Sequence, residues 1–241
     1  MLSVLSVEIR KLNRSLALLL AALAPALIGV FVFFNLLRGR EPFPWALLTQ
    51  TGLAIWAFFL LPMTVTALTA LVAHMEHGPR AWDHLRALPV RRRDLYAAKA
   101  ICVLGLVVLM TGWTLALTWG AGWAAGCVKP EIAPAGALDV IDGLRLGGLI
   151  VLASVLMVAI QFWVALRFAS FVPALAVGIG GTFFAVVAAS ARLGVFFPWT
   201  MAVNMLATEP WRAHAALGLG AGLGAAALLA AIAHLGWREV R

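Results

Sequence analysis

Six long stretches of the chain contain no Asp, Glu, Lys or Arg and are rich in Leu, Ala, Val and Phe. A helix needs about 20 mostly apolar residues to cross the hydrocarbon core of a membrane, and each stretch is long enough. A transmembrane β-barrel would instead require alternating polar and apolar residues, which these stretches lack. The pattern therefore predicts an all-α integral membrane protein with one transmembrane domain over residues 1–241. Its six transmembrane helices are expected at residues 15–37, 44–75, 97–127, 146–166, 168–191 and 213–237.

Residues 1–14 precede the first span and show a helical pattern. Apolar residues recur there at intervals of three and four, which places them on one face of a helix. They are Leu2, Leu5, Ile9 and Leu12, whereas Glu8, Arg10 and Lys11 take the other face. An amphipathic helix with a basic polar side is expected to lie in the membrane interface.

A shorter uncharged stretch, residues 193–208, lies before the last span. It contains Pro198 and Asn204 and is too short and broken to cross the membrane as a helix. Non-helical backbone is tolerated at membrane depth only where protein surrounds it, so we expect a re-entrant or interfacial element here.

The last span itself contains small residues four positions apart, at Gly218/Gly222 and Gly220/Gly224. Such pairs let two helix backbones approach closely, within a subunit or across a dimer.

The connection between the second and third spans, residues 76–96, combines charged residues with a short apolar pattern. Gly78-Pro79 ends the second span, and Pro89 closes a short amphipathic helix over residues 80–88. The apolar side of that helix carries Trp82, Leu85 and Leu88. A helix of this kind on the cytoplasmic face would offer a docking surface to another protein. The alternative is a loop whose Arg residues only set the topology.

The composition supports the same class of protein. Hydrophobic residues make up 63% of the chain and charged residues 12%, which excludes a soluble globule of this size. The net charge of +8 is that of a membrane protein with basic cytoplasmic loops rather than of a nucleic-acid-binding protein. With the N-terminus in the cytoplasm, twelve of the 18 Lys and Arg residues fall inside and six outside. We therefore expect both termini in the cytoplasm, contact with membrane lipid and no nucleic-acid partner.

The sequence shows no catalytic, cofactor-binding or metal-binding site. No lysine follows a glycine as the phosphate-binding loop G-x-x-x-x-G-K-[ST] requires. His74, Glu76 and His77 lie close together but lack the H-E-x-x-H zinc spacing. The spans are also expected to lack the buried charged residues that proton-driven transporters usually need. If the chain moves a substrate uphill, the energy must come from another protein.

The polar residues inside the spans are mainly hydroxyls and amides. Such groups mostly satisfy the backbone or bridge helices, but they can also line a substrate path. The residues that we expect on such a path are Gln50, Thr64, Thr66, Thr69 and Thr182.

With the six-span layout, three local features resemble the ABC-2 type permease subunits of bacterial ABC exporters. Residues 8–15, EIRKLNRS, are similar to the family's N-terminal E-x-x-K-x-x-R-S sequence. Residues 76–99 resemble its coupling segment, with an acidic residue, Gly, L-x-x-L-P, a basic run and Lys. Residues 196–199, FFPW, resemble its element before the last span. This short form is similar to lantibiotic and bacteriocin immunity permeases, and a haem-exporter permease shares the layout.

The resemblance implies a permease of the bacterial cytoplasmic (inner) membrane that is not itself an enzyme. It would pair with an identical or homologous second permease and with two ABC ATPase subunits. ATP and Mg²⁺ would bind to the ATPases, and the chain itself would hold no cofactor. The substrate would be amphipathic or hydrophobic, such as an antimicrobial peptide in self-immunity. The residues implied in ATPase docking and coupling are Glu76, His77, Gly78, Arg80, Trp82, Leu85, Leu88 and Pro89.

Two other functions stay open on the sequence. The chain could be a non-catalytic membrane anchor or assembly subunit, which would bind an ATPase without using its hydrolysis. It could also be a membrane-embedded enzyme, which would need clustered ionisable residues such as His74, Glu76 and His77.

Overall fold

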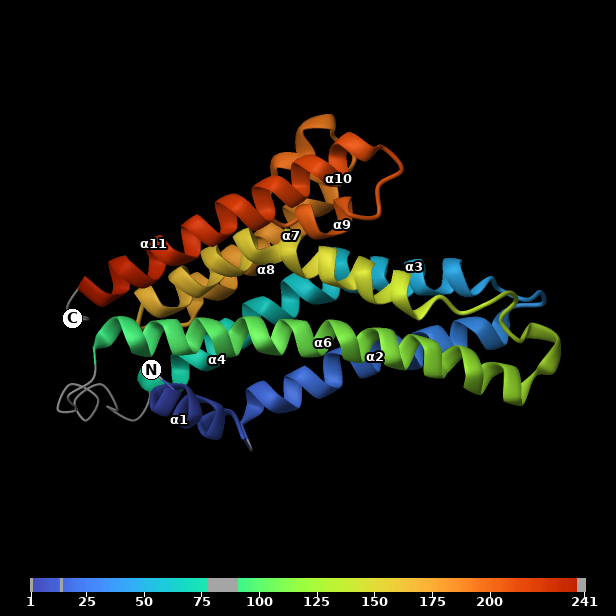
Figure 1. Cartoon of the computed structure of the whole chain (residues 1–241), viewed down its shortest axis with the longest axis horizontal. Coiled ribbons are helices and arrows are strands. Elements are labelled where there is room, and N and C mark those ends of the chain that lie inside the picture. The colour runs from blue at the N-terminus through green and yellow to red at the C-terminus, as the bar shows by residue number, and fades with distance from the viewer. Residues whose placement is uncertain (1, 14, 78–90, 238–241) are drawn as a thin grey trace.

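The computed structural model describes residues 2–13, 15–77 and 91–237 (Figure 1). Within these ranges the chain forms helices joined by short connections and contains no β-strand. Six helical segments are long and apolar enough to cross a membrane. The predicted all-α fold with six transmembrane helices is therefore confirmed.

The bounds of the helices show which predicted spans continue into charged sequence. The spans are α2 (Leu16–Arg38); α3 (Trp45–Ile55), η1 (Trp56–Leu60) and α4 (Leu61–His77); α6 (Arg92–Val128); α7 (Val140–Arg167); α8 (Val172–Ala189); and α10 (Pro210–Leu217), η4 (Gly218–Leu223) and α11 (Gly224–Trp237). Between or before them lie α1 (Leu2–Leu12), η2 (Pro130–Ile132), η3 (Arg192–Phe196) and α9 (Met201–Asn204). α6 and α7 begin before their uncharged stretches because long charged side chains near a helix end can reach the membrane surface.

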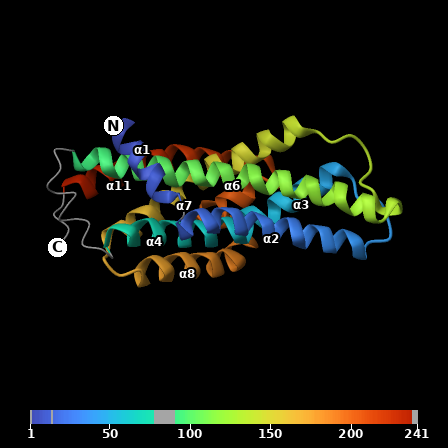
Figure 2. The same ribbon diagram turned by 90° about the horizontal axis from the view of Figure 1, so that it is seen from below.

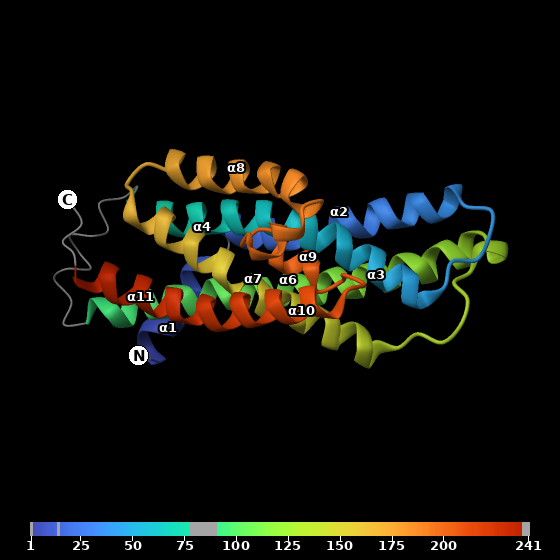
Figure 3. The same ribbon diagram turned by 90° about the horizontal axis from the view of Figure 1, so that it is seen from above.

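The spans run along the long axis of the molecule (Figures 1 and 2). α2 lies beside α6, α8 lies beside α4, and α11 packs against α7 and α6 (Figure 3). The short helix α1 lies against the start of α6. We call the end of the bundle that holds α1, the end of α4, the start of α6 and the end of α11 the proximal end. The opposite end, with the connections 39–44 and 129–139, is the distal end.

The third span is much longer than a membrane is thick. α6 has 37 residues, which corresponds to about 55 Å at 1.5 Å per residue. α8 has only 18 residues, or about 27 Å, close to the hydrocarbon thickness of about 30 Å. At the distal end α2, α3 and α6 extend past α9 and α10 (Figure 1).

The second span changes its helical register near its middle. The π-helical turn η1 ends just before Pro62, which has no N–H to donate to the preceding turn. A wide turn of this kind accommodates the missing hydrogen bond and bends the helix. Trp56, at the start of η1, is fully buried, and its Nε1 donates to the Thr111 Oγ1 of α6 at 3.0 Å. This bond ties the wide turn to the third span.

The last span crosses α7 with its backbone almost in contact. A Cβ atom on Gly220 would lie 2.6 Å from the Ala153 Cα, and one on Gly224 would lie 2.5 Å from the backbone nitrogen of Leu156. Gly222, by contrast, has no atom within 4 Å of such a Cβ. The predicted close approach is therefore confirmed for the Gly220/Gly224 pair, whereas Gly218 and Gly222 meet nothing in the described part of the chain.

The connection before the last span, which contains η3 and α9, is held by its own side chains. Trp199 is buried and stacks on Phe197 with ring centroids 5.4 Å apart. Asn204 is also buried, and its Oδ1 accepts a hydrogen bond from the Arg212 Nε at 2.9 Å. The connection also packs against α8 and α10. The insertion of this element into the membrane stays a prediction.

Asn204→Leu is expected to weaken this connection. Leucine has a similar size but cannot accept the hydrogen bond from Arg212 or replace the bond from the Asn204 Nδ2 to the Thr200 oxygen. Since hydrogen bonds to charged groups typically contribute about 2 kcal/mol, we expect a loss of that size in SDS-induced unfolding of the purified chain. Phe196→Leu, at an exposed neighbouring residue, is the control. An equal loss in both variants would contradict the role of Asn204.

Candidate functional site

The two described ends of the predicted coupling segment both lie at the proximal end (Figure 1). α4 ends at His77 and α6 begins at Arg92. Gly78, Arg80, Trp82, Leu85, Leu88 and Pro89 lie outside the described residues, as do the side chains of Glu76 and His77. Their docking role stays a prediction.

A buried ion pair links α1 to α6 next to this segment. Lys99 is fully buried and Glu8 is only 3% exposed. The Lys99 Nζ lies 2.6 Å from the Glu8 Oε2, and the Lys11 Nζ lies 2.8 Å from the Glu8 Oε1. Removing charges from water is costly unless they are paired and hydrogen-bonded, as these are.

This ion pair corrects two expectations. Glu8 does not lie on the exposed polar face of α1, and Lys99 places a charge inside a span that we expected to be free of buried charge. The helical spacing already carried the signal, because Glu8 shares a face with Leu5 and Leu12, three residues before and four residues after it. Ile9, which we assigned to the apolar face of α1, is 55% exposed, whereas Leu12 of the same face is buried.

The start of α6 also contacts the end of the last span. The Arg93 guanidinium lies over the Trp237 ring, 5.2 Å from its centroid. A Cβ atom on Gly236 would lie 2.6 Å from the Arg93 Cγ, so the two helices are in close contact there. The first two turns of α6 are therefore held by α1 and by α11.

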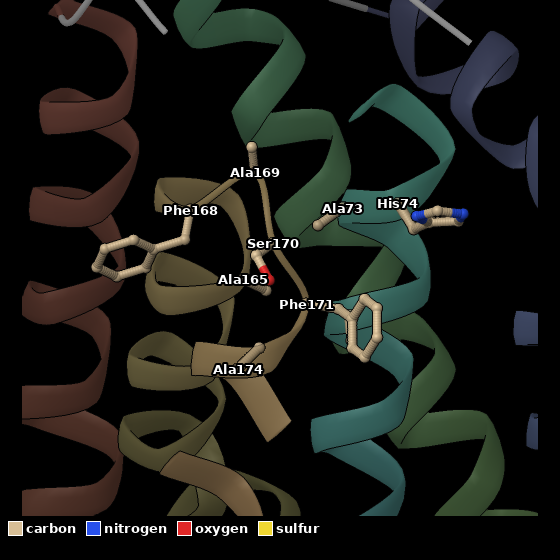
Figure 4. A pocket seen from close by; sticks show the side chains of 9 residues that line it. Ala73, His74, Ala165, Phe168, Ala169, Ser170, Phe171 and Ala174 are labelled. Atoms are coloured by element: carbon tan, nitrogen blue, oxygen red, sulfur yellow. The ribbon is translucent and has the colours of Figure 1, made fainter. Parts of the chain in front are cut away.

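A small hollow of about 210 Å³ opens at the same end between α4 and the turn from α7 to α8 (Figure 4). Its walls are mostly alanine, and Figure 4 shows the Phe168 and Phe171 rings pointing to opposite sides of it. His74 lies at its rim and is exposed. The lining residues are Ala70, Ala73, His74, Ala165, Phe168, Ala169, Ser170, Phe171 and Ala174.

Among the residues that the structure describes, no three His, Cys, Asp or Glu side chains gather in a way that could hold a metal ion. The side chains of Glu76 and His77 lie outside the described residues. The hollow beside His74 is lined by groups that cannot perform acid–base chemistry, apart from that single imidazole.

The residues expected on a substrate path lie in two different environments. Gln50 is exposed and lines a hollow of about 350 Å³ at the distal end, together with Thr49, Asp139 and Asp142. The remaining four are buried, and each hydroxyl donates to a backbone oxygen of its own helix; they are Thr64, Thr66, Thr69 and Thr182. The path itself stays a prediction.

One of these residues belongs to a buried polar cluster that joins three spans. The Thr66 Oγ1 of α4 lies 3.2 Å from the side-chain amide of Gln161 in α7. With its amide oriented to suit its neighbours, Gln161 accepts a hydrogen bond from the Gly178 nitrogen at 2.8 Å and donates to the Ala174 oxygen at 3.3 Å in α8. Gln161 was absent from our predicted path, although it is a rare amide within an apolar run.

The comparisons with known proteins fit this arrangement. A model of the ABC-2 family transporter proteins matches residues 4–188, which run from α1 to the end of α8 and make up most of the chain. No curated protein and no solved structure matches the chain. The matched region contains the buried pair of α1 and α6 and both ends of the segment between α4 and α6. The chain therefore belongs to the ABC-2 family of transporter proteins, and it is a multi-pass membrane permease of an ABC transporter.

Proposed function

We propose that this permease is the transmembrane subunit of an ATP-driven exporter in the bacterial cytoplasmic membrane. Its substrate is amphipathic or hydrophobic, such as an antimicrobial peptide expelled in self-immunity. The observation that carries the proposal is the family match over residues 4–188, which includes the segment between α4 and α6. An ABC transporter of this family works with ATPase subunits, which would bind ATP and Mg²⁺ in place of the permease.

The distribution of charge supports an orientation with the proximal end in the cytoplasm. Arg10 and Lys11 of α1 and the run 91–93 before and at the start of α6 lie at this end. Basic residues of membrane proteins concentrate in cytoplasmic segments. Both termini and residues 76–96 would then face the ATPases, and residues 80–88 would be their docking helix.

The exposed surface of the spans supports a second permease subunit. In the most apolar window of α7, 72% of the residues are buried, but the corresponding figures are 33% for α2, 28% for α8 and 22% for the last span. These three spans leave broad apolar surface for lipid or for another copy or homologue of the chain. The hydroxyls of four buried residues are engaged inside one subunit, namely Thr64, Thr66, Thr69 and Thr182. A substrate route between two permeases is compatible with this, because it would not require these hydroxyls.

The first test is a mild-detergent pull-down of the tagged chain from its native host, read by mass spectrometry. Two ATPase subunits for two permeases are expected, and a second six-span protein in the complex would show a heterodimer. If the chain comes down without an ATPase, the proposal fails. If an ATPase binds but its hydrolysis never drives transport in liposomes, the chain is an anchor subunit. Loss of an activity on alanine substitution of His74, Glu76 and His77 would instead favour an enzyme.

Leu85→Asp and Leu88→Asp are each expected to reduce the recovered ATPase at least about tenfold. Both residues lie on the predicted docking face, and burying an unpaired carboxylate in an interface costs more than the 1.4 kcal/mol that corresponds to a factor of about ten. Ala87→Asp is the matched control, since Ala87 lies on the opposite side of the predicted helix over residues 80–88. Normal ATPase recovery with both leucine variants would refute the assignment of the docking face.

A further inference from the structure

We propose that Glu8 and Lys99 are positioning residues for energy coupling. Their buried ion pair makes α1 move as one body with the start of α6, so that movement of the coupling segment reaches the N-terminal helix. This inference rests on the proposed function, because it assigns a path to a movement that an ATPase would drive.

The ion pair lies close to the coupling segment along α6. Lys99 follows the start of α6 at Arg92 by seven residues, or about 10 Å along the helix. A helix transmits displacement along such a short length with little bending, because its backbone hydrogen bonds are continuous. Force applied at residues 76–91 would therefore arrive at Lys99 almost undiminished.

The ion pair is buried. Lys99 is 0% exposed, and the Glu8 carboxylate contacts both Lys99 and Lys11. Separating Glu8 from Lys99 without admitting water would break a short, charge-assisted hydrogen bond in a low-dielectric setting, which is unfavourable. The contact is therefore expected to persist when α6 moves, and α1 must follow it.

An ion pair fixes the register between two helices in a way that an apolar contact does not. Two apolar side chains of similar volume could hold the helices together equally well, since replacing a buried ion pair by packed apolar residues is often neutral or stabilising. An apolar contact, however, can slide. A carboxylate that hydrogen-bonds to a fixed ammonium at 2.6 Å sets one register between α1 and α6.

A short connection links α1 to the first span, α2. The polar cap Ser15 starts α2 almost directly after α1 ends at Leu12, and its hydroxyl donates to the Leu12 oxygen at 2.7 Å. Gly29 of α2 packs against Leu117 of α6, with only 3.0 Å from its Cβ position to the Leu117 Cβ. Movement of α1 is thereby passed to the first span, which itself contacts the third.

The test uses Glu8→Gln, Lys99→Gln and the exchanged pair Glu8→Lys/Lys99→Glu in the full complex with its ATPase. Arg10→Gln, at an exposed residue of the same helix, removes one charge without touching the pair. We measure ATP hydrolysis per bound ATPase in liposomes and the thermal stability of each complex. We expect each single variant to retain its ATPase and to lose at least about fivefold in hydrolysis. The exchanged pair should recover part of that loss, because it restores an ion pair with residue 99 but places a second lysine three residues before Lys11. Arg10→Gln should match the wild type.

A spectroscopic measurement separates positioning from a purely structural role. Spin labels at Ile9→Cys in α1 and Leu109→Cys in α6, both exposed, report the distance between the two helices in a Cys127→Ser background. In the otherwise native chain this distance should be the same without nucleotide and after trapping with ATP and vanadate. In Glu8→Gln it should shift or broaden upon trapping.

Three results would overturn the inference while leaving the proposed function intact. They are a change of this distance upon trapping in the native pair, native hydrolysis in both single variants, and loss of bound ATPase in proportion to lost thermal stability. If the wild-type chain binds no ATPase at all, it is the proposed function that fails.

Discussion

Gly220→Ala is expected to destabilise the permease by about 3 kcal/mol, because the added Cβ would overlap the backbone of α7. The position would lie 2.6 Å from the Ala153 Cα, and the Ala153 carbonyl oxygen lies closer still. A flexible side chain could turn aside, but a helix backbone can only separate as a whole. The last span would then lose contact with α7 along several turns. SDS-induced unfolding of the purified chain in detergent measures the loss.

Gly222→Ala is the matched control in the same π-helical segment. It adds the same methyl group to the same span, but no atom lies within 4 Å of its Cβ position. Stability should change by less than about 0.5 kcal/mol. If both variants were equally destabilised, the crossing with α7 would not be the cause, since Gly222 does not contact it. If neither were, the close approach of η4 to α7 would be refuted.

Gly178→Ala is also expected to destabilise the permease by about 3 kcal/mol, because the added Cβ would overlap the polar cluster between α4, α7 and α8. A Cβ atom at this position would overlap the Thr66 hydroxyl and methyl and the Gln161 amide. The Thr66 side chain is branched at Cβ and cannot easily rotate away. The added methyl group would also displace the Gln161 side chain from the residue 178 nitrogen, and the Gln161 amide would stay buried with fewer hydrogen-bond partners.

Two further variants check this explanation. Gly180→Ala, on the same helix with no atom within 4 Å, should be nearly neutral. Thr66→Ala combined with Gly178→Ala should be more stable than Gly178→Ala alone, since it removes the overlapping atoms. Strict additivity of the two single changes would contradict a direct contact between the residues.

The number and type of the spans could be predicted from the sequence because the physical requirement is crude. A run of about 20 residues without charge has few alternatives to a membrane helix, so the six-span fold followed from spacing alone. The exact ends did not follow, because helices such as α6 continue through Arg92, Arg93 and Asp94 beyond the apolar run. A charge next to a span can end it, cap it or snorkel from it, and composition does not distinguish these outcomes.

The buried pair of Glu8 and Lys99 was missed for a different reason. Lys99 stands at the edge of an apolar stretch, where a charge usually meets water or lipid headgroups, and Glu8 lies among the charged residues of α1. Burial depends on whether another helix covers that edge, and α1 covers α6 only in the folded chain. The polar cluster of Thr66, Gln161 and Gly178 shows the same limit, since it joins α4 to two later helices and Thr66 and Gln161 are 95 residues apart.

The distal connections restrict how the third span can move. Beyond α6 the chain pairs with the connection 39–44, where the Ala135 nitrogen donates to the Phe43 oxygen and the Trp45 nitrogen donates to the Ala135 oxygen, both at 3.1 Å. The Lys129 Nζ also donates to the Gly39 oxygen at 3.1 Å. Because α1 and α11 contact its other end, α6 is held at both ends. It can tilt or bend sideways, but it cannot slide along its own axis without breaking these bonds together.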